Sequence, residues 1–146
     1  MSVLSKSTWS PLTAAVALAL ALSGAYSATA FGADVKVSLA GDQEVPPVTT
    51  QAKGSGTVTI GDDMSVKGNI TTTGVTGTAA HIHMAAAGKN GPVIVPMTKS
   101  GDAGWTFAPD AKLNADQMKA FKAGELYVNV HSAANPGGEI RGQLKP

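Results

Sequence analysis

From residue 35 onward, short stretches with an apolar residue at every second position alternate with clusters of glycine, proline and aspartate. An apolar residue at every second position indicates a β-strand with one face in a core, and the clusters indicate turns. Many short strands of this kind are typical of an all-β sandwich or barrel. The predicted strands are Val35–Leu39, Gly56–Ile60, Met64–Ile70, Ala79–Met84, Val93–Met97, Gly104–Phe107, Leu126–His131 and Glu139–Leu144.

One segment, LNADQMKAFKAGE, departs from the β pattern. Asn114 is a favourable N-cap, Gln117 stands where a capping box needs it, and Gly124 supplies a stop signal. These residues predict a helix of about two and a half turns that buries Met118 and Phe121 and connects two strands. We expect it to cover one end of the β structure.

Two connections also carry structural signals. The polar stretch 41–56 contains Pro46 and Pro47, which cannot donate to a strand ladder, so we expect it to cross a sheet end or rim. The turn residues at 135–138, NPGG, predict that the strands on either side of them are neighbours.

Residues 1–30 have the composition of a cleaved signal peptide. Lys6 precedes an apolar run from Leu12 to Leu22, and Ala28 and Ala30 form the small-residue pattern that a signal peptidase accepts. A membrane anchor is the competing interpretation, but the run is about half of the ~20 apolar residues that a spanning helix needs. We therefore predict cleavage near Ala30, one domain over residues 31–146, a periplasmic or secreted location, and no membrane attachment after cleavage.

The charge balance and the absence of cysteine exclude several functions. Without residues 1–30 the chain has ten basic and ten acidic residues, so it lacks the positive surface that binds nucleic acid or anionic lipid. Without cysteine there are no thiolate metal sites, cysteine nucleophiles or iron–sulfur clusters. We find no catalytic triad, phosphate-binding loop or paired catalytic carboxylates, so no catalytic residue is assigned, and a binding protein is favoured over an enzyme.

The three histidines of the chain are predicted to lie on the outer face of the sheet. In the stretch AAHIHM the alternation places His81 and His83 together, opposite the apolar face, and the same count along LYVNVH turns His131 outward. If the two strands are neighbours, the three imidazoles can converge on one point.

Three converging imidazoles predict a transition-metal site with His81, His83 and His131 as ligands. Copper is favoured, with zinc as the alternative, because nitrogen ligands bind Cu(II) more tightly. Water, a carboxylate or a methionine would complete the coordination. The competing interpretation is a solvated polar stripe on one strand and an unrelated histidine at the end of another.

The single arginine, Arg141, is predicted to share the outer face of the last strand with Glu139. Its planar group suits a fixed carboxylate or a bound anion. A structural ion pair, with Glu139, Glu125 or an aspartate as the partner, is favoured over a role in attracting anions.

The stretches AHIHMAAAGKNGPVIVPM and GELYVNVHSAANPGGEIRGQL resemble the CHRD domain, the module named after chordin, over about residues 34–145. The resemblance implies an exported, β-rich domain. A fainter resemblance is to copper–zinc superoxide dismutase, because His81, His83, His131 and Arg141 follow the order of its copper ligands and arginine. The bridging histidine and the zinc ligands of that enzyme are absent here.

Together these resemblances imply an all-β Greek-key β-sandwich, immunoglobulin-like or superoxide dismutase-like, with one short helix in a connection. They also imply a three-histidine copper site. The leading hypothesis is an exported copper-binding protein that acts in copper handling. The alternatives are a metal-free module for protein interaction or adhesion, with an unknown partner, and a weak copper enzyme of the superoxide dismutase type.

Overall fold

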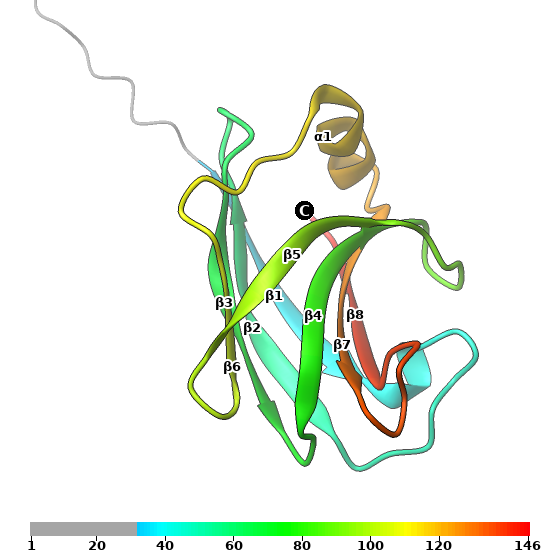
Figure 1. Ribbon diagram of the computed structural model, residues 1–146. Helices are drawn as coiled ribbons and strands as arrows, with labels where there is room; N and C mark the ends of the chain where they lie inside the picture. Colours follow the sequence, from blue (N-terminus) through cyan, green and yellow to red (C-terminus); the bar gives the residue numbers. More distant parts are fainter. Residues whose placement is uncertain (1–31) are drawn as a thin grey trace, which may run out of the picture.

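The computed structural model describes residues 32–146, which form eight strands, one α-helix and a short 3₁₀ helix (Figure 1). The predicted signal peptide lies outside the described residues. The strands are β1 (Ala33–Ala40), β2 (Lys53–Ile60), β3 (Val66–Thr73), β4 (Gly77–Met84), β5 (Val93–Ser100), β6 (Gly104–Phe107), β7 (Leu126–Ser132) and β8 (Ile140–Leu144). Each of them contains or overlaps one predicted strand, so the all-β class is confirmed.

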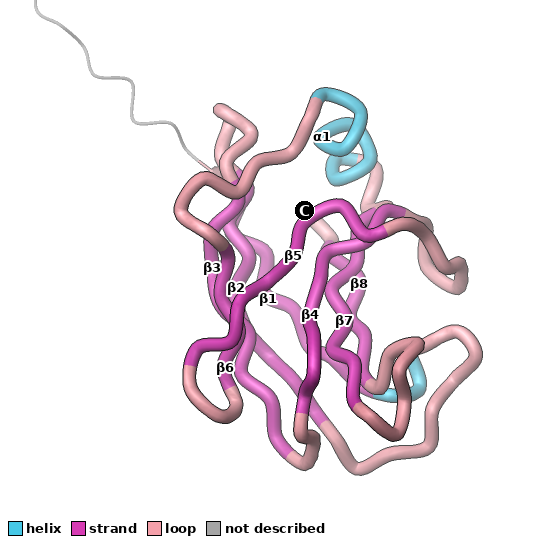
Figure 2. The backbone as a smooth tube through the Cα atoms, in the orientation of Figure 1, coloured by secondary structure: helices cyan, strands magenta, loops and turns pink. Residues whose placement is uncertain are grey.

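The strands close into one antiparallel barrel in the order β1-β2-β3-β6-β5-β4-β7-β8 (Figure 2). The first and last strands complete the ring, where Ala40 of β1 pairs with Arg141 of β8. The prediction of a sandwich with two separate sheets is therefore corrected to a closed barrel. The alternation of apolar and polar residues along a strand indicates that one face of the strand is buried. This pattern is the same in a sandwich and in a barrel, so it cannot distinguish them. The pairing of the outermost strands decides between them.

The interior of the barrel is filled by the inward side chains of all eight strands. Val58, Ile70, Ile82 and Val128 have no exposed surface. These residues alternate with outward-facing positions on their strands, as the period of two requires. The core predicted from the apolar positions is therefore the core of the barrel.

The helix α1 (Ala115–Lys122) lies at one end of the barrel between β6 and β7 (Figure 1). The capping box between Asn114 and Gln117 is present in both directions. Phe121 is buried and Met118 is partly buried against the core. The chain leaves the helix at Gly124 with a φ of 72°, a conformation that favours glycine.

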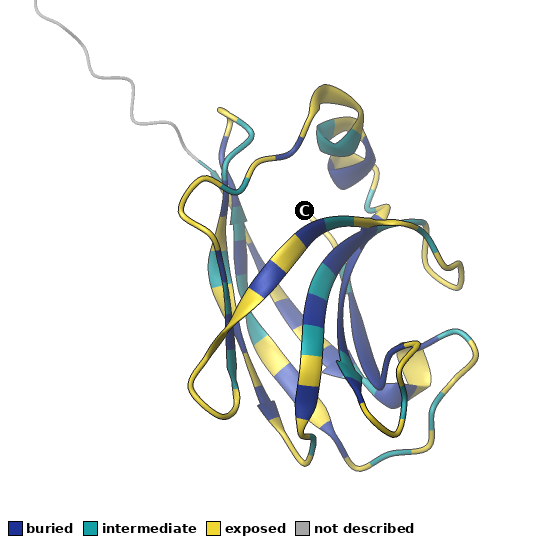
Figure 3. Cartoon of the chain, viewed as in Figure 1, coloured by how far each residue is buried: buried dark blue, intermediate teal, exposed yellow. Residues whose placement is uncertain are grey.

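The outer faces of β7 and β8 are also buried, which distinguishes this side of the barrel from the rest (Figure 3). The connection between β1 and β2, which contains the 3₁₀ helix η1 (Gly41–Gln43), lies against them. Asn90 donates a hydrogen bond to the carbonyl of Val45 in this connection, and Thr50 donates one to the carboxylate of Glu139. We call the buried polar residues where this connection meets β7 and β8 the covered face. They are Glu44, Tyr127, Asn129 and Arg141, all of them at most 5% exposed.

Candidate metal centre

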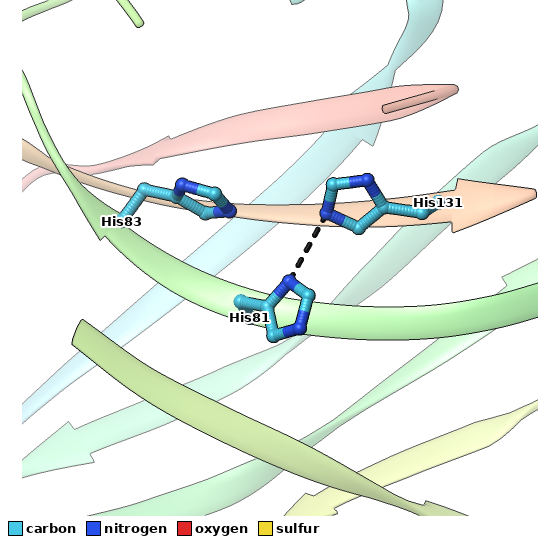
Figure 4. Close-up of side chains that lie close together, drawn as sticks. All are labelled: His81, His83 and His131. Carbon is cyan, nitrogen blue, oxygen red and sulfur yellow. Dashed lines mark hydrogen bonds between the residues drawn. The ribbon is translucent and has the colours of Figure 1, made fainter. Parts of the chain in front are cut away.

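His81 and His83 of β4 and His131 of β7 come together on the outside of the barrel (Figure 4). The two strands are antiparallel neighbours, with His81 opposite Asn129 and His131 opposite Ala79. One nitrogen from each ring lies within 4.8 Å of the other two. The predicted adjacency of the two strands is therefore confirmed, and the three imidazoles form a single cluster.

Two of the rings are oriented by backbone carbonyl groups. The Nδ1 atom of His83 lies 2.9 Å from the carbonyl oxygen of Gly91, and that of His131 lies 2.9 Å from the carbonyl oxygen of Pro136. A carbonyl oxygen only accepts hydrogen bonds, so both Nδ1 atoms must carry the proton. In the neutral form of each ring, the Nε2 atom then has a free lone pair, which is the form that binds a metal.

The third ring, His81, already contacts one of these lone pairs. Its Nδ1 lies 3.1 Å from the Nε2 of His131, so in the metal-free protein the Nδ1–H of His81 donates to His131. A metal ion would take the place of this proton, which would move to the Nε2 of His81. The ligand atoms would be Nδ1 of His81 and Nε2 of the other two rings.

The spacing of the ligand atoms fits a metal after small side-chain rotations. Bonds of about 2.0 Å to one ion place imidazole nitrogens about 3.3–3.5 Å apart. The contact between His81 and His131 is already near this value, and the widest separation, at most 4.8 Å, needs to close by at most about 1.5 Å. The Nε2 of His83 is buried without a hydrogen-bond partner, so a cation there would satisfy an otherwise unpaired acceptor.

His81 and His83 are kept in their neutral, metal-binding form by their surroundings. Burial lowers the pKa of His81 and of His83, and the nearby His131 lowers both pKa values further. The hydrogen bond to Gly91 opposes this effect at His83 without reversing it. At neutral pH the imidazoles of His81 and His83 are therefore unprotonated.

Arg141 and Glu139 occupy separate positions on this side of the barrel. No carboxylate of the described residues lies within 4.0 Å of the Arg141 guanidinium, which instead donates to Asn90, Gln143 and the carbonyl of Ala86. Its charged group lies 3.4 Å from the centre of the Tyr127 ring, a cation–π contact. Glu139 accepts a hydrogen bond of 2.7 Å from Thr50.

Comparison with known families matches the CHRD domain over residues 35–144. This chain belongs to the CHRD family. No curated protein and no solved structure matches it. CHRD domains occur in secreted and periplasmic proteins. Within residues 32–146, none of the helices of this CHRD domain has the length and apolar character needed to cross a membrane.

The aromatic ring of Tyr127 joins the histidine cluster of the CHRD domain to Arg141. The ring of His83 stacks on it at 4.8 Å, with 8° between the planes. Because β7 lies between β4 and β8, Tyr127 lies between His83 and Arg141. The tyrosine hydroxyl also accepts a hydrogen bond from the backbone N–H of Gly91, whose carbonyl orients His83. The position of His83 is therefore determined by packing on one side and by a hydrogen bond on the other.

Glu44 is a buried carboxyl group that the sequence analysis did not single out. It is 5% exposed and lies beside Asn129. Burial raises the pKa of Glu44 to about 7, although the positive charge of Arg141 and the nearby amide of Asn129 act in the opposite direction. Glu44 stands in a polar connection without periodicity, so no local pattern indicates that it is buried.

We predict that the CHRD domain loses stability between pH 4.5 and pH 8 because of Glu44, and that the Glu44→Gln variant avoids this loss. The folded state holds the Glu44 proton more tightly than the unfolded chain, whose ordinary pKa is 4.5. The stability that this tighter proton binding gives to the folded state is complete below pH 4.5 and is lost as the pH rises to about 7. Glutamine has no proton to lose, so its contribution does not change with pH. Relative to its value at pH 4.5, the free energy of unfolding of the variant at pH 8 should exceed that of the wild type by on the order of 2 kcal/mol.

Urea unfolding of both proteins at several pH values measures this difference. The histidines are common to both proteins, so their effects cancel in the comparison. Two stability curves that run parallel from pH 4.5 to 8 would contradict the prediction.

Proposed function

We propose that this CHRD domain binds a transition metal, copper in preference to zinc, and acts in copper handling in the periplasm or outside the cell. The ligands are His81, His83 and His131. The observation that carries the proposal is the convergence of three imidazole nitrogens from two neighbouring strands, two of them with their second nitrogen held by a backbone carbonyl. This second interaction is the arrangement that orients histidine ligands in metal sites.

The donor set supports copper. Nitrogen ligands follow the general order of affinities in which Cu(II) exceeds Zn(II). The His-X-His pair on a strand gives two ligands that lose little conformational freedom on binding, and β7 supplies the third. The absence of cysteine removes the thiolate ligands that zinc uses in many structural sites.

Titration of the protein with Cu(II) by isothermal calorimetry tests the proposal. We expect the wild-type protein to bind one equivalent of Cu(II), and His81→Ala to bind it at least about tenfold more weakly, because one of three ligands is lost. Equal, weak binding by the two proteins would overturn the metal site. A metal-free interaction module would then be the better description of this CHRD domain.

A further inference from the structure

The side chain of Asn129 lies beside the histidine cluster. It points to the same outer face of β7 as His131, two residues further along, and it stands directly opposite His81 on β4. Directly opposed residues of antiparallel strands have Cβ atoms about 4.5–5.5 Å apart. The Asn129 side chain also lies close enough to the His83 ring to affect the pKa of His83. Asn129 therefore adjoins all three proposed ligands.

The carboxamide oxygen of Asn129 is buried and has no hydrogen-bond partner. The residue as a whole is 2% exposed. The amide of asparagine usually satisfies both ends when it is buried, because an unpaired polar atom costs free energy. The Oδ1 of Asn129 is one of three such atoms in the described part of the chain, together with Nε2 of His83 and Oε1 of Glu44.

The neighbours of Asn129 explain which way its amide points. Its Nδ2 and the Oε1 of Glu44 lie on the same side of Gly138, at 2.6 Å and 2.4 Å from the point that a Cβ of Gly138 would occupy. Ionised Glu44 has only acceptor oxygens, and Asn129 favours this ionised form, so the NH₂ end of the amide faces Glu44. The oxygen end then faces away from Glu44, on the outer face that carries the histidines.

The Nε2 of His83 and the Oδ1 of Asn129 are thus two buried acceptors, and neither has a hydrogen-bond donor. Gly91 holds the proton of His83 on Nδ1, so the Nε2 of His83 is an acceptor, and the Oδ1 of Asn129 is an acceptor as well. A cation bound by both atoms would satisfy them together, and one donor atom each of His81 and His131 lies within 4.8 Å of the donor atom of His83.

We infer that the Asn129 carboxamide oxygen is the fourth ligand of the site, which makes it a site of three nitrogens and one oxygen. The inference rests on the proposed function, because it concerns the same metal ion. A neutral carbonyl oxygen is a hard ligand and suits Cu(II), whereas Cu(I) is selected by soft sulfur ligands and is satisfied by the imidazoles alone. Asn129 therefore gives the site a preference for Cu(II).

The affinities of Asn129→Ala for the two oxidation states of copper test this inference. We expect its Cu(II) affinity to fall about tenfold, because an oxygen ligand is lost, and its Cu(I) affinity, measured anaerobically by competition with a chelator, to stay within about twofold of the wild type. Damage to the fold would lower both affinities alike, so equal losses for Cu(II) and Cu(I), or no loss for either, would overturn the inference.

Asn129→Asp supplies a second, opposite readout. A carboxylate at this position is a stronger ligand than an amide, so Cu(II) affinity should rise about tenfold, and the electron paramagnetic resonance spectrum of bound Cu(II) should change in both variants. A spectrum of Asn129→Ala identical to that of the wild type would overturn the inference while the histidine site stands. If the wild-type protein bound no copper at all, the proposed function itself would fail.

Discussion

Replacing His83 by alanine is expected to lower the Cu(II) affinity of the protein at least about 100-fold, a loss of about 2.7 kcal/mol in binding free energy. His83 is the most preorganised of the three proposed ligands. It is 7% exposed, its Nδ1 is held by Gly91, and its ring is stacked on Tyr127. A ligand that is already oriented loses little entropy on binding, so its removal costs more than that of a mobile one. Calorimetric titration in competition with a chelator measures the loss.

Tyr127→Phe is the matched control for His83→Ala. It keeps the ring that stacks on His83 and removes only the hydroxyl that accepts the N–H of Gly91. We expect its Cu(II) affinity to stay within about threefold of the wild type, because the ligand atoms are unchanged. Circular dichroism of both metal-free variants checks that the barrel is folded. Retention of wild-type affinity by a folded His83→Ala protein would exclude His83 from the site.

Gly138→Ala is expected to destabilise the barrel by about 2–4 kcal/mol. Gly138 has a φ of 129°, in the region that favours glycine, and it ends the turn between β7 and β8. An added Cβ would lie 2.4 Å from the Oε1 of Glu44 and 2.6 Å from the Nδ2 of Asn129. Both side chains are buried, so neither can move away without disturbing the covered face. The free energy of unfolding in urea measures the effect.

The neighbouring glycine provides the control for this prediction. A Cβ at Gly137 would meet no atom within 4 Å. The free energy of unfolding of Gly137→Ala should therefore lie within about 1 kcal/mol of the wild-type value. A small stabilisation is expected because alanine restricts the conformations of the unfolded chain. If the two alanine variants lost equal stability, the close approach of Gly138 to the covered face would not be what requires glycine there.

The strands were predictable because the alternation of apolar and polar residues is a local property of the chain. Ile82 and Val128 alternate with His83 and Asn129, and this alone assigns the first pair to the core. The helix was predictable for a similar reason, since a capping box involves residues only three positions apart. The closure of the strands into a barrel was not predictable, because the pairing of β1 with β8 joins segments about a hundred residues apart in the sequence.

The three residues of the histidine cluster could be predicted from the sequence, but the residues that surround them could be predicted only in part. The outward direction of His81, His83 and His131 follows from the period of two on each strand. The burial of His83 was not predicted: it is only 7% exposed, and the connection between β4 and β5 lies against it at the carbonyl of Gly91. No pattern in the residues of that connection indicates which part of the barrel it covers.

The sequence by itself thus determined the eight strands, the helix and the face on which each histidine lies, because these depend on residues a few positions apart. Only the tertiary structure decided that the strands close into a barrel, that β4 lies beside β7, and that Glu44 and Asn129 are buried next to the cluster. These features depend on contacts between distant segments, whose choice among many pairings is made by the packing of the whole core and is not encoded in any single stretch.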